Sequence, residues 1–136
     1  MVDLRAVRRV CFESARFTGG TLADFRIPGA TPNFWQAVVE YRDRTVAVVA
    51  AQDLPVLAIA RPRSFDFTPT RDWSPLEFVD EPELSAVLAG YAEFRVLAPA
   101  DLERSFVAAE WPHLLPADVA HWKPVTVGEA LFNYWD

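Results

Sequence analysis

The sequence has a single cysteine, Cys11, so the chain cannot form an internal disulfide bond. We therefore expect a reducing compartment, the cytoplasm. Long apolar runs are also missing, because the longest, residues 46–51, is far below the ~20 residues that a membrane-spanning helix needs. No uninterrupted apolar stretch follows the arginines near the N-terminus, as it would in a secretory signal. We expect a soluble protein that does not contact membranes.

Positive charge is scarce in the second half of the chain. The whole sequence carries 13 Lys plus Arg against 19 Asp plus Glu, a formal charge of −6. Residues 1–69 hold nine basic and seven acidic residues, whereas residues 70–136 hold four basic and twelve acidic ones. Because an acidic surface repels phosphate groups, nucleic-acid binding is disfavoured, and a basic protein is the partner that this charge favours.

Apolar residues are plentiful, which points to a folded chain. Hydrophobic residues make up 51% of the sequence and charged residues 24%, as in an ordinary globular protein. This composition excludes a disordered chain, and 136 residues fit one domain. We expect residues 1–136 to form a single α+β domain.

Alternating polar and apolar residues predict three consecutive antiparallel strands. Residues 35–41 alternate with a period of two, and the charged residues 42–44 predict a hairpin turn. The second strand, residues 45–51, is apolar on both faces, as a central strand is. A turn at 53–55 leads to the third strand, residues 56–60.

Helical spacing dominates the second half. Pro82 and its acidic neighbours predict the start of a helix that ends at Gly90. Thr126 and Glu129 stand at capping-box spacing, before an apolar stripe that predicts the last helix.

Shorter elements complete the expected fold. Residues 93–97 predict a strand, and residues 64–68 and 76–79 are further candidate strands. Pro99 and Pro116 each predict the start of a short helix. The helix that starts at Pro99 should carry Leu102, Phe106 and Ala109 on one face. Residues 4–15 share a helical face, although a strand is the alternative there. We expect an antiparallel or mixed sheet of about five strands, with short helices mainly in the C-terminal half packed on one face.

His113, His121 and Cys11 are the residues best suited to catalysis or metal binding. The two histidines lack the short spacing of metal ligands, so packing near Trp111 and Trp122 is the preferred interpretation. No nucleophile signature surrounds Cys11, so a buried structural thiol is preferred there. We expect neither a metal nor a cofactor.

Two further features could bind ligands but have a simpler explanation. Gly19-Gly20 could bind an anion if a helix begins after it, but a turn with positive φ is preferred because the phosphate-loop lysine is absent. A cluster of carboxylates could serve acid–base or magnesium chemistry, but is better explained as a solvated helix start. Its members are Glu77, Asp80, Glu81 and Glu83.

The segment 61–75 is the strongest candidate for binding. It spans fifteen residues, contains three prolines, and carries arginine and aromatic side chains, which are common anchors of protein interfaces. The candidate interaction residues are Arg61, Arg63, Phe65, Phe67, Arg71 and Trp73. The alternative is that the aromatic side chains cover the sheet.

The sequence contains no catalytic motif, and two kinds of function remain. The first is a non-catalytic binding protein with the general character of a bacterial immunity protein or antitoxin, which is small, cytosolic and acidic. The second is a small enzyme or ligand-binding domain with a pocket near His113 and His121. The sequence does not indicate an oligomeric state.

Overall fold

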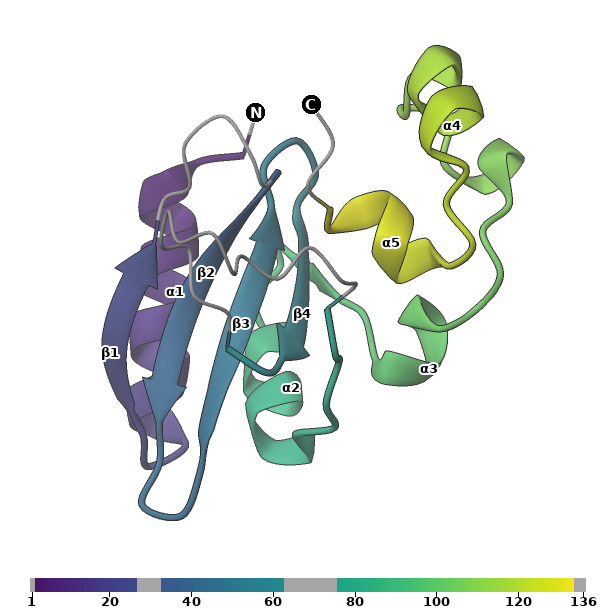
Figure 1. The fold of residues 1–136 in the computed structure, drawn as a ribbon. Coiled ribbons are helices and arrows are strands. Elements are labelled where there is room, and N and C mark those ends of the chain that lie inside the picture. Colours follow the sequence, from purple (N-terminus) through teal and green to yellow (C-terminus); the bar gives the residue numbers. More distant parts are fainter. Residues whose placement is uncertain (1, 27–32, 63–75, 134–136) are drawn as a thin grey trace, which may run out of the picture.

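A five-stranded sheet forms the centre of the computed structural model, which describes residues 2–26, 33–62 and 76–133 (Figure 1). The strands lie in the order β1-β2-β3-β4-β5. Their bounds are β1 (Thr21–Arg26), β2 (Phe34–Glu40), β3 (Thr45–Ala51), β4 (Val56–Ala60) and β5 (Arg95–Val96). Neighbours from β1 to β4 are antiparallel, whereas β5 pairs with β4 in parallel. The expected mixed sheet and the three-stranded meander are confirmed.

The described ranges contain five α-helices and one 3₁₀ helix in addition to the sheet. They are α1 (Leu4–Phe17), α2 (Pro82–Ala89), α3 (Pro99–Leu102), η1 (Ala108–Glu110), α4 (Pro116–Trp122) and α5 (Val127–Leu131). The N-terminal segment is therefore the helix and not the strand. Its first turn is capped by Asp3, whose carboxylate accepts a hydrogen bond from the Arg5 amide at 3.0 Å.

The sheet separates two hydrophobic clusters. On one face, Val46 and Val48 of β3 pack with α1 and α2. On the other face, Val49 and Ala51 pack with α3 and α5. The short C-terminal helices α3 and α5 thus share one face, as expected. The expectation of a single covered face is corrected by α1 and α2, which cover the opposite face. Both faces can be buried because β3 and β4 are apolar throughout.

The glycine pair Gly19-Gly20 lies between the end of α1 and the start of β1. Gly19 has φ +83°, a conformation that L side chains rarely adopt, so the preferred turn is confirmed. No helix begins after this turn, because residues 21–26 form β1. The anion-binding interpretation of the glycine pair is therefore wrong.

The helix expected from Pro99 begins at that residue, but the expectation that it carries Leu102, Phe106 and Ala109 on one face is wrong. α3 ends at Leu102, and the following residues pair with the segment before α5 instead. The Phe106 amide donates to the Val125 carbonyl oxygen at 2.9 Å, and the Val127 amide donates to that of Arg104 at 3.0 Å. A longer helix would need these same backbone groups, so the tertiary pairing prevents it.

Residues 76–79 return to the sheet beside β4, as the sequence suggests. Phe78 forms an antiparallel bridge with Ala60, and the Val79 amide donates to the Ile59 carbonyl oxygen at 3.0 Å. The strand expected at 64–68 lies outside the described residues. Across the part of the chain that is described, no helix is long and apolar enough to cross a bilayer.

Candidate protein-binding groove

Of the six candidate interaction residues in segment 61–75, the structure describes Arg61, which directly follows β4. The other candidates lie outside the described residues: Arg63, Phe65, Phe67, Arg71 and Trp73.

Arg61 is paired with Glu77, which lies just beyond the other end of that segment. Its Nε atom is 2.9 Å from Glu77 Oε1, and its amide donates to the Glu77 carbonyl oxygen, also at 2.9 Å. The two side chains are 68% and 67% exposed, so the ion pair itself contributes only about 0–1 kcal/mol. The backbone pairing and the ion pair together bring the two flanks of segment 61–75 side by side.

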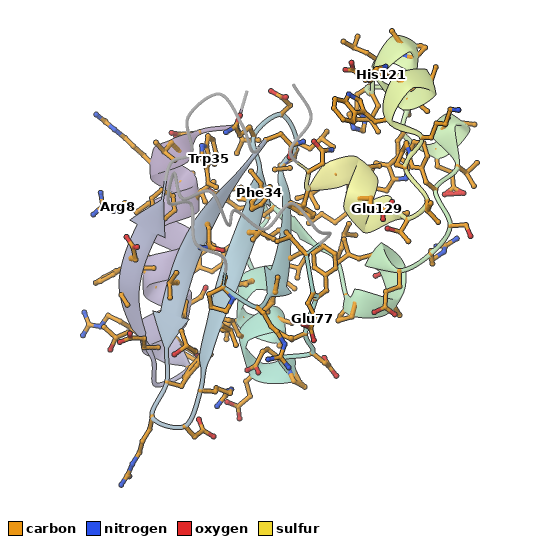
Figure 2. All side chains as sticks on the ribbon, viewed as in Figure 1. Arg8, Phe34, Trp35, Glu77, His121 and Glu129 are labelled. Atoms are coloured by element: carbon orange, nitrogen blue, oxygen red, sulfur yellow. The ribbon has the colours of Figure 1, made fainter. Side chains whose placement is uncertain are left out.

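A groove of about 330 Å³ begins at Glu77 and runs between the 76–78 segment, the end of α3 and the start of α5. We call it the acidic groove. Figure 2 shows Glu77 and Glu129, which belong to two of these elements. The side chains most relevant to binding are Leu76, Glu77, Phe78, Leu102, Glu103 and Glu129.

The floor of the acidic groove is apolar. Leu76 and Leu102 are 7% and 1% exposed, and both belong to the cluster beneath α3 and α5. Phe78 packs on the same cluster, with its ring centroid 5.9 Å from that of Phe132. Gly128 allows α5 to approach this ring, since a Cβ at position 128 would lie 2.5 Å from Phe78 Cε2.

The rim of the groove is negatively charged. Glu129 Oε2 accepts a hydrogen bond from the Val125 amide at 2.8 Å, while Thr126 Oγ1 accepts one from the Glu129 amide at 3.2 Å. The predicted cap is therefore present, although the carboxylate reaches Val125 and not Thr126. The Glu103 side chain is exposed and has no hydrogen-bond or ion partner within residues 2–26, 33–62 and 76–133. Glu103 is thus the least neutralised charge on the rim.

The two histidines lie near tryptophans, as preferred from the sequence, but both are exposed. Their ring centroids are 5.9 Å (His113 to Trp111) and 4.8 Å (His121 to Trp122) from those of the indoles. His121 lies on α4, which projects away from the sheet (Figure 2). His113 borders a hollow of only about 40 Å³, whereas pockets for small molecules usually measure about 300–1,000 Å³.

Cys11 is a buried structural thiol, 1% exposed within the cluster between α1, α2 and the sheet. Burial raises the pKa of the Cys11 thiol to about 12, so the reactive thiolate is suppressed at neutral pH. Among the described residues, no group of three His, Cys, Asp or Glu side chains is placed to hold a metal ion.

The carboxylates around α2 do not converge on a common site. Glu81 binds Arg44 of the β2–β3 hairpin, with Nη2 and Nε of Arg44 at 2.8 Å and 3.0 Å from Glu81 Oε1. The Arg44 guanidinium also lies 4.3 Å from the centre of the Tyr41 ring. The hydrogen bond to Glu81, with a second one to Asp43, raises the pKa of Arg44 above its ordinary value. Glu81 is thus an ion-pair partner of Arg44 with a side chain only 14% exposed, whereas Glu77 pairs with Arg61.

The acidic groove could not be identified from sequence. The sequence indicates Glu77 as a member of a carboxylate cluster. Leu102 and Glu103, in contrast, come from a segment expected to be the interior of a longer helix. The sequence did indicate the Thr126–Glu129 cap, although it did not show that Glu129 also borders a groove. Comparison of the chain with protein-family models, with curated proteins and with solved structures found no match.

Proposed function

We propose that this chain is a non-catalytic protein-binding domain that recognises a basic partner through the acidic groove. Its general character is that of an immunity protein or antitoxin, which inhibits another protein by binding it. The observation that carries the proposal is an apolar groove edged by Glu77, Glu103 and Glu129. A basic partner satisfies both parts of this surface, since apolar side chains can enter the floor while Lys or Arg side chains meet the rim.

The size of the groove supports an anchoring role. A volume of about 330 Å³ is at the lower end of the range of about 300–1,000 Å³ for small-molecule pockets. A few side chains of a larger partner fill such a space, and a few well-buried side chains carry most of the energy of a typical interface.

The acidic part of the chain that contributes the groove supports the choice of partner. Residues 76–133 contain ten acidic and three basic residues, a formal charge of −7. A field of this sign accelerates the encounter with a basic protein and slows the encounter with an acidic one. Arg61 offsets part of the charge at Glu77, but Glu103 is unpaired within the described chain.

The first experiment is to isolate the chain from its source cells under native conditions and to measure the mass of the intact complex. The expected result is one added polypeptide at fixed stoichiometry, with a basic isoelectric point. The association rate constant with that polypeptide should fall as salt rises from about 10 mM to 0.5 M, because the Debye length shrinks from about 30 Å to a few ångströms.

A pair of charge reversals then tests the location. Glu103→Lys places a positive charge on the rim, and Glu83→Lys makes the same change on the exposed first turn of α2, outside the groove. We expect Glu103→Lys to weaken binding by about tenfold or more and Glu83→Lys to weaken it by less than about threefold. Equal effects of the two variants would reject the groove as the site, and the absence of any polypeptide partner would reject the function.

A further inference from the structure

The outer face of α1 concentrates positive charge in a chain that is acidic as a whole. Residues 2–18 hold four basic and two acidic residues, whereas the formal charge of the chain is −6. The four arginines are all exposed: Arg5, Arg8, Arg9 and Arg16. Because successive residues of an α-helix are rotated by about 100°, these side chains and Phe12 lie within one stripe roughly 100° wide. We call this stripe the arginine face, and Figure 2 shows Arg8 on the outer side of the helix.

An aromatic ring lies in the middle of the arginine face. Phe12 is 47% exposed, and the Arg16 guanidinium lies 5.7 Å from the centre of its ring. Phe17, at the end of the same helix, is 81% exposed. Arginine and aromatic side chains are the residues that anchor protein interfaces most often. The face therefore offers an apolar contact surrounded by positive charge.

The arginines do not stabilise the helix that carries them. The first turn of α1 contains no acidic residue, and Arg5 lies there, next to the positive end of the helix dipole. Arg5 also stands three and four residues before Arg8 and Arg9, and like charges at these spacings cost about 0.2–0.5 kcal/mol per pair. Residues that oppose local stability without a compensating contact are typical of functional surfaces. The charge of the face therefore indicates contact with something outside the chain.

Three of the four guanidinium groups are available to a partner. Arg9 is engaged, because it forms ion pairs with Glu13 and Glu93. The side chains of Arg5 and Arg8 have no hydrogen bond or ion pair within residues 2–26, 33–62 and 76–133, and Arg16 has only its contact with Phe12. A guanidinium is a planar fork of donors that matches the two oxygens of a carboxylate. Carboxylates are thus suitable partners for all three.

The surroundings of the face favour a protein over a surface of phosphate groups. Glu13 and Glu93 lie beside Arg9 and are both 47% exposed. A nucleic acid or a lipid surface would bring phosphates close to these carboxylates, and the charge of −6 on the whole chain repels it further. A protein can place carboxylates opposite the arginines and other side chains opposite Glu13 and Glu93. A second copy docked through the same face by twofold symmetry would place arginines opposite arginines.

We propose that the arginine face of α1 docks an acidic segment of another protein, with Arg5, Arg8 and Arg16 binding its carboxylates and Phe12 contacting one of its apolar side chains. α1 packs on the opposite face of the sheet from α3 and α5 (Figure 1). The docking surface is therefore separate from the acidic groove and does not depend on the function proposed for the groove.

The test is a titration of the ¹⁵N-labelled full chain at pH 7, followed through the backbone amide resonances. The probe is a synthetic peptide of glutamate and leucine, and the same peptide with lysine in place of glutamate is its control. We expect the acidic peptide to shift the resonances of α1 saturably, with a Kd on the order of 0.1 mM that rises with salt. The lysine peptide should leave the α1 resonances unchanged. Duplex DNA and vesicles that contain phosphatidylserine are titrated in parallel.

Substitutions on α1 locate the bound peptide. Arg8→Glu should weaken binding of the acidic peptide by about tenfold or more. Arg104→Glu is the matched control, because Arg104 is also exposed but directly follows the C-cap of α3, and it should weaken binding by less than about threefold. Phe12→Ala removes the exposed ring without a change of charge and should weaken binding by about threefold. Both α1 substitutions change exposed side chains, so the fold should persist, and far-UV circular dichroism checks this.

Four outcomes would overturn the proposal. Unchanged α1 resonances in the presence of the acidic peptide would mean that α1 is not a docking surface. Equal effects of Arg8→Glu and Arg104→Glu would place the peptide elsewhere. Tighter binding of duplex DNA or of the vesicles than of the peptide would assign the face to phosphate groups. Self-association of the chain without peptide, abolished by Arg8→Glu, would make a second copy the occupant.

Discussion

Replacing Gly128 with alanine tests how closely α5 approaches the 76–78 segment. Gly128 is buried in the first turn of α5. A Cβ at this position would meet Phe78 Cε2 at 2.5 Å, Phe78 Cζ at 3.1 Å and the Leu102 carbonyl oxygen at 3.2 Å. Real Cβ atoms almost never come as close as the first of these distances, so the ring or the helix has to move.

Two opposing effects determine the change in stability. Alanine favours the helix by up to about 1 kcal/mol over glycine, and by less in the first turn of a helix. Overpacking a buried site usually costs about 1–3 kcal/mol. The Phe78 ring cannot rotate away freely because it also packs against Phe132, and the Leu102 carbonyl oxygen belongs to the backbone. We therefore expect Gly128→Ala to lower the free energy of unfolding by about 1–2 kcal/mol.

Urea unfolding followed by far-UV circular dichroism measures this change. Gly90→Ala is the control, because Gly90 has φ −72° and a Cβ there would meet nothing closer than the Val87 carbonyl oxygen at 3.3 Å. The control should stay within about 0.5 kcal/mol of the unmodified protein. In a Phe78→Leu background, Gly128→Ala should cost at least about 0.5 kcal/mol less than it does alone, because the shortened side chain no longer opposes the added methyl group.

The double-mutant cycle can refute the close approach of α5 and Phe78. If Gly128→Ala is neutral or stabilising, the helix does not contact the ring as closely as the structure has it. If the two substitutions are additive, the loss arises somewhere other than the Phe78 ring. Either result would also mean that the acidic groove differs in shape from the one described, because Phe78 and Gly128 both line it.

Three local features give further predictions. Thr126→Ala removes the cap of α5 and should lower the free energy of unfolding by about 1 kcal/mol in the same urea assay. Gly19→Ala should lower it by about 1–2 kcal/mol because φ is +83°, and Gly19→Asn should cost less, since asparagine tolerates this conformation; equal costs would point to another cause. Cys11 should react with a thiol reagent only as fast as the protein unfolds. Its raised pKa makes the neutral thiol the native form, so the stability from this group is complete below pH 9.0, the thiol's ordinary pKa, and falls as pH rises toward about 12. This fall should be absent in Cys11→Ala, and rapid labelling of the native protein would contradict the burial.

The central meander was predictable because local signals agree with the fold there. Alternation in β2, the charged hairpin residues and the Asp53–Pro55 turn each favour the observed strands, and no distant contact opposes them. The same holds for α5, where the predicted cap forms next to a buried apolar stripe.

β1 was not predictable because a bulge conceals its period. Leu22 pairs with Val39 and Asp24 with Val38, so the register shifts at Ala23. The bulge places Leu22 and Phe25 on the same face, where both pack against the cluster formed with α1. Apolar residues at positions i and i+3 are typical of a helix and not of a strand. The six residues of β1 therefore do not show the alternation that identifies a strand in a sequence.

The candidate binding site depends on a long-range pairing that no local pattern encodes. Leu102 and Glu103 border the groove only because the chain leaves α3 after Leu102 and its next residues, 104–106, pair with 125–127. Propensity favours a longer helix here, but the backbone bonds to the segment before α5 prevail. The negative charge of this region could therefore be predicted from the sequence, whereas the acidic groove that the charge borders could not.

The layer formed by α3, α4 and α5 gives an additional reason to expect a positively charged partner. These helices have four, seven and five residues, all too short to be stable without contacts to the rest of the fold. α4 buries none of its residues, so it contributes little of that support (Figure 1). Residues 99–131, which form this layer, contain five acidic and two basic residues, a formal charge of −3, and repulsion among the carboxylates opposes compaction of the layer. A basic partner seated on the acidic groove would relieve this repulsion, so binding should stabilise the C-terminal layer more than the meander. Amide hydrogen exchange in the complex should accordingly slow most in residues 99–131, and uniform slowing across β2 to β4 would argue against docking at the groove.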